Sequence, residues 1–230
     1  MLTIRFLGHS AFALNDGSRE VLVDPFLTGN PLAAAGPDEF NPVAILLTHA
    51  HNDHVGDTVS IAKRSGATVI STFELGEYLE SLGVNAVYGN HGGTIKFDGG
   101  SAKMTQAWHT SSYTTDNGVV APGVPAGLIV RFGGKTVYFA GDTCLFGDMA
   151  LIGEEGLDVA VIPIGDHFTM GPTDAVRALK FLQPAVAIPC HYNTFPPLVQ
   201  DAHAFARDAQ EKAGVKVEVL DPGESYSVAG

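Results

Sequence analysis

Two uninterrupted apolar runs, Val43–Leu47 and Val159–Ile164, dominate the hydrophobic pattern of the chain. Each run has the length of a strand, and the lack of polar positions is typical of a strand buried on both faces. Thr173–Leu182 instead follows a proline suited to a first helical turn and repeats its apolar residues every three or four positions, which predicts an amphipathic helix. The same criteria predict strands over Thr3–Leu7, Ala11–Leu14, Arg19–Asp24, Val43–Thr48, Ala67–Ser71, Val84–Tyr88, Thr94–Asp98, Ala102–Trp108, Leu128–Phe132, Lys135–Ala140, Val159–Ile164, Ala185–Pro189 and Val215–Leu220, and helices over Asp53–Ser65, Phe73–Leu82, Asp148–Glu155, Thr173–Leu182 and Leu198–Ala213.

The order of these elements predicts two similar halves. Each half opens with a hairpin that ends at an aspartate, Asp24 or Asp142, and strand–helix units follow in both. This arrangement predicts an α/β protein built as a four-layer αββα sandwich, in which two mixed sheets pack face to face beneath helices. No linker separates the halves, so we expect residues 1–230 to form a single domain. The long loops Phe26–Asn41 and Ser111–Ala126 are expected to set substrate specificity.

The composition excludes several classes of protein. Apolar residues make up 45% of the chain and charged residues 17%, which supports a large hydrophobic core. The 13 basic and 25 acidic residues give a net charge of −12, which argues against nucleic-acid binding, although a bound metal could still attract a small anion. No apolar run approaches the roughly 18 residues of a membrane span, and the N-terminus does not resemble a signal peptide. We therefore expect a cytoplasmic protein that does not act at a membrane.

The segment Thr48–His54 carries the most specific chemical signal, an H-x-H-x-D-H pattern. It follows a predicted buried strand directly and enters a predicted helix. His49 and His51 are two residues apart, so in extended backbone they point the same way, whereas Asp53 and His54 are redirected by the first helical turn. One short segment can therefore supply ligands to two adjacent metal positions. Imidazole and carboxylate ligands suit zinc, manganese or iron.

Three further ligand candidates follow other predicted strands. His109, Asp142 and His191 come after the strands ending at Trp108, Ala140 and Pro189. Functional groups of α/β proteins gather at the carboxyl ends of strands, so we expect these side chains to lie near the histidine-rich segment.

These motifs resemble those of the metallo-β-lactamase superfamily over essentially the whole chain. THAHNDH, His109, FAGDT and PCH match its successive metal motifs in order. LGHSAF, VLVDPFLTGNP and PIGDHFTMGP resemble a branch of small metal-dependent hydrolases, close to the ascorbate-6-phosphate lactonases and more distantly to N-acyl-phosphatidylethanolamine phospholipase D.

The resemblance implies a set of ligands and a reaction. One metal would be held by His49, His51 and His109, a second by Asp53, His54 and His191, and Asp142 would bridge the two. The metals would be zinc or manganese, with iron or nickel as alternatives. A hydroxide shared between them would attack a small ester, lactone, amide or phosphoester without a covalent enzyme intermediate. Asp53 and Asp142 would thus serve both metal binding and catalysis, and the substrate would be a small molecule.

Three other polar residues are candidates for supporting roles. His167 lies in a glycine-rich loop after a buried strand and is our candidate for the general acid or a substrate ligand. His9 could orient a metal ligand, contact substrate or be a hydrogen-bonded core histidine. Asp24 could orient a ligand histidine or simply end its strand beside Pro25.

The remaining histidines, the cysteines and the loop aromatics have simpler interpretations. His91 is expected in a turn and His203 on a solvated helix face. The two cysteines, Cys144 and Cys190, are interpreted as small buried hydrophobic residues rather than ligands. Tyr113 and Phe168 are the aromatic residues expected to form walls of a substrate pocket.

Other functions of the superfamily remain as alternatives. One is an iron-dependent oxidoreductase, because the superfamily includes persulfide dioxygenases and diiron flavoproteins. The diiron flavoproteins carry a glutamate where this chain has His51, which disfavours that class. A nuclease is another, and the net charge of −12 weighs against it. A non-catalytic metal-binding protein is disfavoured by the complete ligand set. The sequence leaves the oligomeric state open and is compatible with a homo-oligomer.

Overall fold

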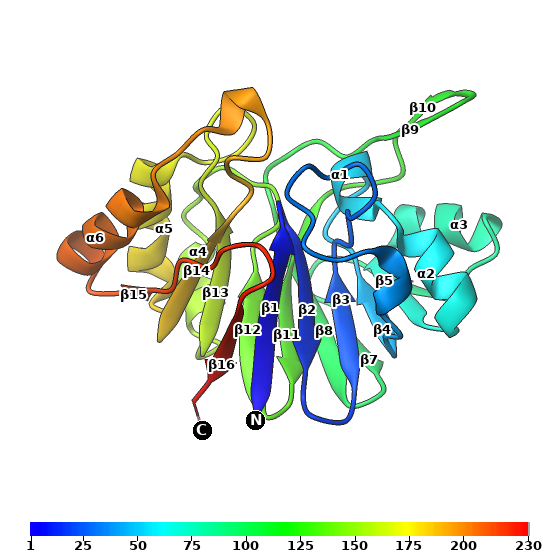
Figure 1. The fold of residues 1–230 in the computed structure, drawn as a ribbon, viewed down its shortest axis with the longest axis horizontal. Helices are drawn as coiled ribbons and strands as arrows, with labels where there is room; N and C mark the ends of the chain where they lie inside the picture. Colours follow the sequence, from blue (N-terminus) through cyan, green and yellow to red (C-terminus); the bar gives the residue numbers. More distant parts are fainter. Residues whose placement is uncertain (230) are drawn as a thin grey trace.

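The computed structural model describes residues 1–229 and contains two seven-stranded sheets that pack face to face, with helices on the outer side of each (Figure 1). This is the predicted four-layer αββα arrangement. In spatial order, the first sheet contains β16 (Ser225–Val228), β1 (Leu2–Gly8), β2 (Ala11–Asn15), β3 (Glu20–Val23), β4 (Ala44–Leu46), β5 (Thr68–Thr72) and β6 (Ala86–Gly89). The second contains β15 (Lys216–Val217), β14 (Val186–Cys190), β13 (Val159–Pro163), β12 (Lys135–Phe139), β11 (Ala126–Phe132), β8 (Gly100–Gln106) and β7 (Thr94–Phe97).

The helices flank the two sheets. α2 (Thr58–Ser65) and α3 (Phe73–Ser81) cover the first sheet, and α4 (Met149–Gly153), α5 (Pro172–Leu182) and α6 (Ala202–Ala213) cover the second (Figure 1). The short helix α1 (Asn52–Val55) and two 3₁₀ turns, Pro37–Glu39 and Pro196–Leu198, lie in connecting segments. No helix in residues 1–229 is long and apolar enough to cross a membrane.

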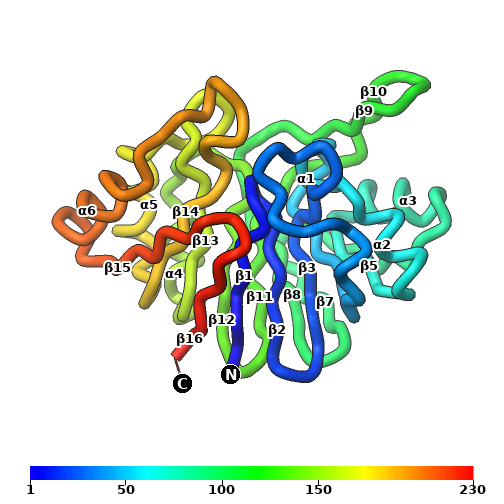
Figure 2. The backbone as a smooth tube through the Cα atoms, in the orientation of Figure 1, coloured from blue at the N-terminus to red at the C-terminus, as the bar shows by residue number. Residues whose placement is uncertain are grey.

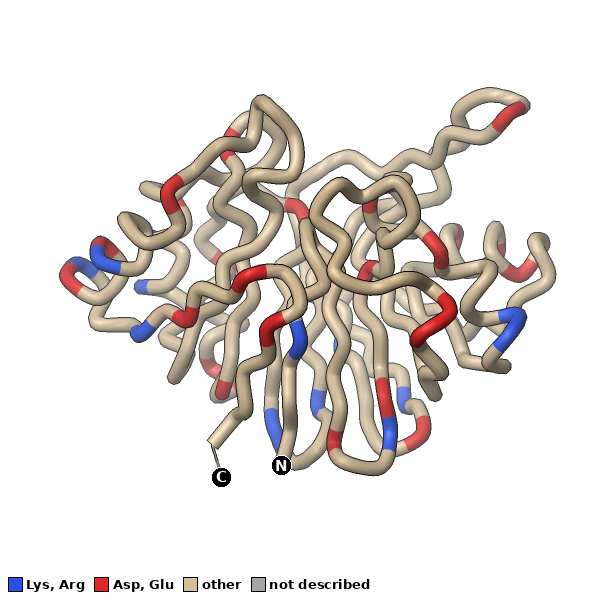
Figure 3. The backbone as a smooth tube through the Cα atoms, viewed as in Figure 1, with Lys and Arg blue, Asp and Glu red and all other residues tan. Residues whose placement is uncertain are grey.

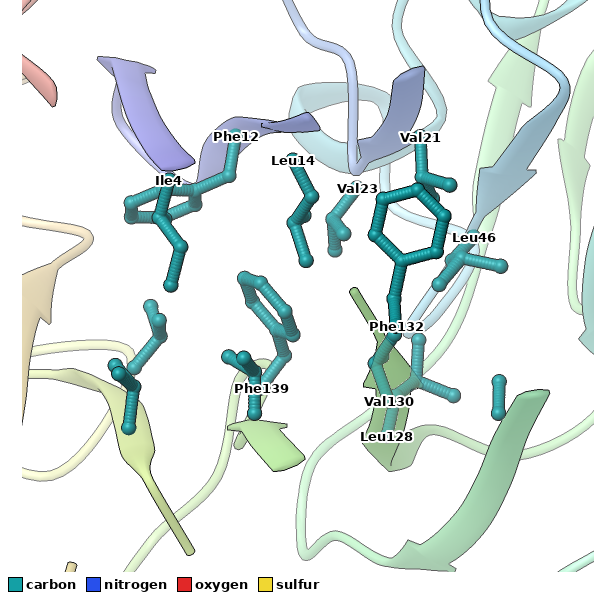
Figure 4. Close-up of a cluster of buried hydrophobic side chains, with 14 of the residues drawn as sticks. Ile4, Phe12, Leu14, Val21, Val23, Leu46, Leu128, Val130, Phe132 and Phe139 are labelled. Carbon is teal, nitrogen blue, oxygen red and sulfur yellow. The ribbon is translucent and has the colours of Figure 1, made fainter. Parts of the chain in front are cut away.

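The principal core lies between the sheets. Ile4, Phe12 and Leu14 point from the first sheet toward Leu128 and Phe139 of the second (Figure 4). The rings of Phe12 and Phe139 meet edge to face across this interface, with centroids 5.7 Å apart. Burying a large apolar side chain contributes about 1.5–3 kcal/mol, so this layer joins both sheets into one packed unit.

Both sheets place the carboxyl ends of their parallel strands at one edge. Strands β3 to β6 are parallel in the first sheet, as are strands β12 to β15 in the second. The segments after β3, β4, β12, β13 and β14 therefore emerge together, at the upper edge in Figure 1. We call this the catalytic edge, because the sequence predicts the catalytic residues in these segments.

The predicted division into two halves is only partly correct. β7 and β8 precede the second half in sequence but pair within the second sheet. The terminal strand β16, which the sequence pattern did not reveal, pairs with β1 in the first sheet and brings the two chain ends side by side (Figure 2). Its alternation is confined to four residues, too few for a clear strand signal.

Two predicted helices begin or continue differently. The predicted helix Asp53–Ser65 is divided into α1 and α2, because Gly56 adopts φ +42° and ends the first turn. The helix predicted from Leu198 begins at Ala202, where the Asp201 carboxylate accepts a hydrogen bond from the Ala204 N–H at 2.9 Å.

Two further predictions differ from the structure at exposed segments. The strand predicted over Val215–Leu220 pairs only at Lys216–Val217, at the sheet edge. The loop predicted from Ser111 contains a small hairpin, β9 (Tyr113–Thr115) and β10 (Gly118–Val120), which extends from the body (Figure 1). With only three residues each, Tyr-Thr-Thr and Gly-Val-Val, these strands are too short to give a hydrophobic alternation.

Gly56 provides a test of how the chain turns beside the histidine-rich segment. Its φ of +42° and ψ of −121° are readily adopted only by glycine. A Cβ atom there would lie 2.4 Å from Phe26 Cα and 2.5 Å from the Pro25 carbonyl oxygen. We expect Gly56→Ala to lower the free energy of unfolding by about 3 kcal/mol, because backbone strain and a backbone clash add. Urea unfolding followed by circular dichroism measures this change.

Gly134→Ala is the matched control. Gly134 also has a positive φ, +75°, but nothing lies within 4 Å of a Cβ atom built there. Its substitution should therefore cost about 1 kcal/mol from backbone strain alone. Equal losses in the two variants would contradict the clash.

Candidate metal centre

The carboxylate of Asp142 lies at the centre of the predicted ligands. Its Oδ1 atom is 3.3 Å from His54 Nε2. Its Oδ2 atom is 3.1 Å from His191 Nε2, 3.4 Å from His109 Nε2 and 3.9 Å from His49 Nε2. Asp142 is almost fully buried, so these nitrogens form its immediate surroundings.

The potential ligands form two groups. In the first, one donor atom from each of His49, His51, His109 and Asp142 lies within 4.8 Å of the others. The His49 Nε2 and His51 Nδ1 atoms are only 2.9 Å apart, as expected for alternate residues of an extended segment. In the second group, donor atoms of His9, Asp53, His54 and His191 meet the same distance limit. The structure thus brings together all seven residues predicted as ligands, and adds His9.

Asp24 contacts His54 directly and is connected to His49 through Thr48. Its Oδ2 accepts from His54 Nδ1 at 2.7 Å and from the Thr48 hydroxyl at 2.6 Å, and its Oδ1 accepts from the Thr48 N–H at 2.9 Å. The Thr48 hydroxyl is in turn 3.0 Å from His49 Nδ1. Of the two roles considered for Asp24, the structure therefore shows a contact with His54, which is a candidate ligand. Such outer contacts fix the tautomer and the ring orientation of metal ligands.

The chemistry of this cluster fits a metal cation. A proton on His54 Nδ1 that is donated to Asp24 leaves a lone pair on Nε2, which faces the carboxylate oxygen Oδ1 of Asp142. Both facing atoms are buried and neither has a hydrogen-bond partner. Two acceptors in contact repel unless a cation lies between them, and metal ligands are the usual explanation of such orphaned atoms.

The electrostatics of the same pair agree with this interpretation. Burial opposes charge on His54, but the carboxylates of Asp142 and Asp24 outweigh it and raise the His54 pKa well above its ordinary value. Burial likewise opposes charge on Asp142, but His191 and His54 hold its pKa well below the usual range. The protein therefore stabilises positive charge between these side chains, as a cation-binding site requires.

His9 is the member that the sequence left undecided. It is fully buried, its Nε2 lies 3.1 Å from Asp53 Oδ2, and its Nδ1 lies 2.8 Å from the Thr194 hydroxyl. Its backbone carbonyl accepts from the His191 N–H at 2.7 Å. Burial lowers the pKa of His9 to about 4, so the ring is neutral at neutral pH. His9 thus contacts Asp53 through its side chain and His191 through both its ring and its backbone carbonyl.

A cleft of about 410 Å³ opens above the ligand groups. Phe168 forms one wall, as predicted. Tyr113 does not line the cleft, because Ser112 and Thr114 face it and Tyr113 therefore points to the opposite side, toward Tyr78. The lining residues are His51, Asn52, Asp53, His109, Thr110, Ser112, Thr114, Asp142, Phe168 and His191.

The two long loops contribute unequally to this cleft. Ser112 and Thr114 come from Ser111–Ala126, and the Asn52 side chain exchanges two hydrogen bonds with the Thr114 backbone, at 2.9 and 3.0 Å. No residue of Phe26–Asn41 is among the lining residues. The loop Phe26–Asn41 instead packs behind the histidine cluster, where the Asp57 carboxylate accepts hydrogen bonds from the Leu27 and Thr28 N–H groups.

His167 lies outside the two ligand groups and outside the cleft lining. Its side chain is exposed and its ring packs edge to face against Phe168, with centroids 4.5 Å apart. The structure therefore connects His167 to the cleft only through Phe168. Its catalytic role stays a prediction.

The remaining histidines and cysteines mostly match their interpretations. His91 lies in a turn, where its Nε2 is 2.8 Å from the Pro125 carbonyl oxygen, and His203 is exposed on α6. Cys190 is buried, as predicted. The prediction for Cys144 is wrong, because it is exposed. Its neighbour Thr143 takes the buried position instead and accepts a hydrogen bond from the Trp108 N–H.

Comparisons with known proteins agree with this fold and indicate a metal-dependent hydrolase. A family model described as a beta-lactamase superfamily domain matches residues 19–192. A UPF0173 metal-dependent hydrolase from Thermus thermophilus is 54% identical over 224 residues, which cover 97% of this chain and 98% of the relative. One from Deinococcus radiodurans is 48% identical over 98% of this chain and 99% of its own length.

Solved structures show the same fold. A metallo hydrolase from the hyperthermophilic archaeon Ignicoccus hospitalis matches with a TM-score of 0.88 and 37% identity, covering 98% of this chain and 97% of that one. CmlA, a diiron β-hydroxylase from Streptomyces venezuelae, matches with a TM-score of 0.75 and 18% identity, covering 98% of this chain and 54% of that one. At this identity the likeness to CmlA concerns the fold alone.

Asp24→Asn tests the support of the metal ligands. The substitution keeps the shape but removes the charge and one of the two acceptor oxygens beside His54 and Thr48. We expect zinc affinity, measured by competition with a chelator, to fall about 10–100-fold. Asp57→Asn is the control, since Asp57 also accepts two N–H bonds but touches no ligand. An equal loss in both variants would rule out a specific role for Asp24.

Proposed function

Because the chain belongs to the β-lactamase superfamily and is a metal-dependent hydrolase, we propose that it binds two divalent metal ions and hydrolyses a small ester, lactone, amide or phosphoester. One observation carries the proposal: Asp142 lies between two groups of ligands, in contact with nitrogens from both. A carboxylate in that position suits a bridge between two metals. Zinc or manganese fits the nitrogen and oxygen ligands best, with iron or nickel as alternatives.

The residues of the chain would divide the work of such a site. His49, His51 and His109 would hold one ion, and Asp53, His54 and His191 the other. When bound, the two ions would supply a hydroxide at neutral pH and an electrophile for the oxygen of the substrate. Asp24 would keep His54 in the tautomer that leaves Nε2 free.

The cleft would orient the substrate through uncharged groups. Thr110, Ser112 and Thr114 present hydroxyls beside the ligands, and Phe168 offers an apolar wall. We propose that His167 contacts the distal part of the substrate, since its ring supports Phe168. A cytoplasmic protein of one domain that acts on a small molecule, without nucleic-acid or membrane partners, remains our expectation for the cell. A homo-oligomer is compatible with it.

Metal content and hydrolysis test the proposal directly. Protein purified without chelator should contain about two zinc or manganese ions per chain and hydrolyse members of a lactone and ester panel in an EDTA-sensitive manner. Asp142→Ala should lose bound metal and slow hydrolysis by more than about 100-fold, because even outer contacts to ligands are worth 10–100-fold. Elemental analysis and initial rates give both results.

Asp148→Ala is the control for this substitution. Asp148 is exposed, follows Asp142 in the same connecting segment and belongs to neither ligand group. Its variant should keep full metal content and activity. Full metal content and activity in Asp142→Ala would contradict the proposal. One iron per chain without hydrolysis would favour the oxidoreductase alternative.

His167→Gln tests the role of the exposed histidine. Because His167 reaches the cleft only through Phe168, we expect KM to rise about 3–10-fold while kcat changes less than about twofold. His203→Gln, at another exposed histidine, should alter neither constant. If kcat instead falls more than about tenfold and one limb of its pH profile disappears, His167 is the general acid.

A further inference from the structure

Among residues 1–229, the catalytic edge carries no lysine or arginine. Lysine and arginine are absent from residues 20–62, 104–130, 136–176 and 181–206. These four stretches contain the segments after β3, β4, β8, β12, β13 and β14, which surround the ligand groups and the cleft. Figure 3 shows the consequence: the basic residues lie toward the opposite ends of the strands and on the outer helices, whereas acidic residues occur along the catalytic edge.

Several basic residues elsewhere in the chain form ion pairs with nearby carboxylates. Arg64 contacts Asp38, Lys103 and Arg131 contact Glu155, and Lys135 contacts Asp158. None of the ten residues that line the cleft is a lysine or arginine. A negative group on a substrate would therefore find no protein cation at this edge.

The charges within the site do not supply a counterion either. Asp24, Asp53 and Asp142 provide three carboxylates within or directly behind the two ligand groups. Together with a hydroxide, they would neutralise two divalent ions. Many sites that recognise phosphate or carboxylate groups use arginine or lysine, which pair with the anion through charge-assisted hydrogen bonds.

The uncharged lining offers a different kind of recognition. Thr110, Ser112 and Thr114 provide hydroxyls that both donate and accept, and Asn52 is already committed to the Thr114 backbone. Phe168 adds an exposed aromatic face. Such groups suit a substrate that presents hydroxyl or carbonyl groups rather than charges.

We infer that the substrate carries no charged group apart from the atoms that react at the metals, and is a neutral, hydroxylated lactone or ester rather than a phosphorylated one. The inference rests on the proposed hydrolytic function and narrows its substrate class. It also argues against a nucleic-acid substrate, whose neighbouring phosphates would lie along an acidic edge.

Two hydroxamates that differ only in a remote phosphate provide the test. Gluconohydroxamate and 6-phosphogluconohydroxamate share the same metal-binding group, so binding to the zinc-loaded protein does not depend on turnover. We expect calorimetry to show at least about tenfold weaker binding of the phosphorylated probe at about 0.02 M salt, with a smaller difference at about 0.5 M salt, where charges are screened. Equal or tighter binding of the phosphorylated probe would overturn the inference.

Thr114→Lys places a cation on the cleft wall, and Thr114→Met is its uncharged control of similar length. Thr114 is exposed and lines the cleft, so a longer side chain can extend into solvent. The lysine variant should bind the phosphorylated probe at least about tenfold more tightly than the methionine variant, with equal affinity for the neutral probe. The same affinity of both variants for the phosphorylated probe would contradict control by charge.

The outcomes separate this inference from the proposed function. Tight binding of the neutral hydroxamate without hydrolysis of any lactone or ester would refute the hydrolytic proposal and leave the charge preference standing. Hydrolysis that favours 6-phosphogluconolactone over gluconolactone would support the hydrolase and refute the charge preference. Binding of neither probe to zinc-loaded protein would overturn the inference, because the cleft would not then present the metals to such ligands.

Discussion

The buried carboxylate of Asp142 is the constraint on which the rest of the structure depends. A charge removed from water costs several kcal/mol unless it is paired, and Asp142 is only 3% exposed. Its nearest partners come from three connecting segments, those after β4, β8 and β14, and the first of these contains α1. Both sheets must therefore bring their strand ends to one point. The core between the sheets, where Phe12 packs against Phe139, holds the two sheets in the relative position that this convergence requires.

Backbone strain gathers at the same edge. Among residues 1–229, seven non-glycine residues have positive φ, and all but Gln183, which ends α5, lie at the catalytic edge. His9, Asp24 and His191 are among them, with φ of +59°, +45° and +55°. Left-handed backbone costs about 1–2 kcal/mol for such residues, so it persists where surrounding contacts demand it. Here the contacts are those that aim side chains at Asp53, His54 and Asp142.

The sequence was sufficient to predict the layers and the residues that the structure brings together as seven candidate ligands, because strand periodicity and the spacing of the H-x-H-x-D-H segment are local signals. It was insufficient where the outcome depends on distant contacts. The sequence left the role of His9 open because its side-chain contacts are not local. They are made with Asp53, 44 residues away, and with Thr194, 185 residues away. Gly56 ends α1 because Pro25 and Phe26 occupy the space beside it. Tyr113 turns from the cleft because a short hairpin, invisible in the pattern, imposes strand alternation.

The absence of lysine and arginine from the catalytic edge would serve metal binding as well as the proposed choice of substrate. A flexible lysine near Asp53 or Asp142 would compete with a metal for the carboxylate, which must stay free to act as a ligand. If the only benefit were to keep these carboxylates free for a metal, lysine and arginine would need to be absent only from positions within reach of Asp53 and Asp142. The absence extends over whole connecting segments, including Phe26–Asn41, which supplies no residue of the cleft lining. An edge uniformly without cations acts at longer range, by leaving an approaching anion without attraction before it reaches the cleft.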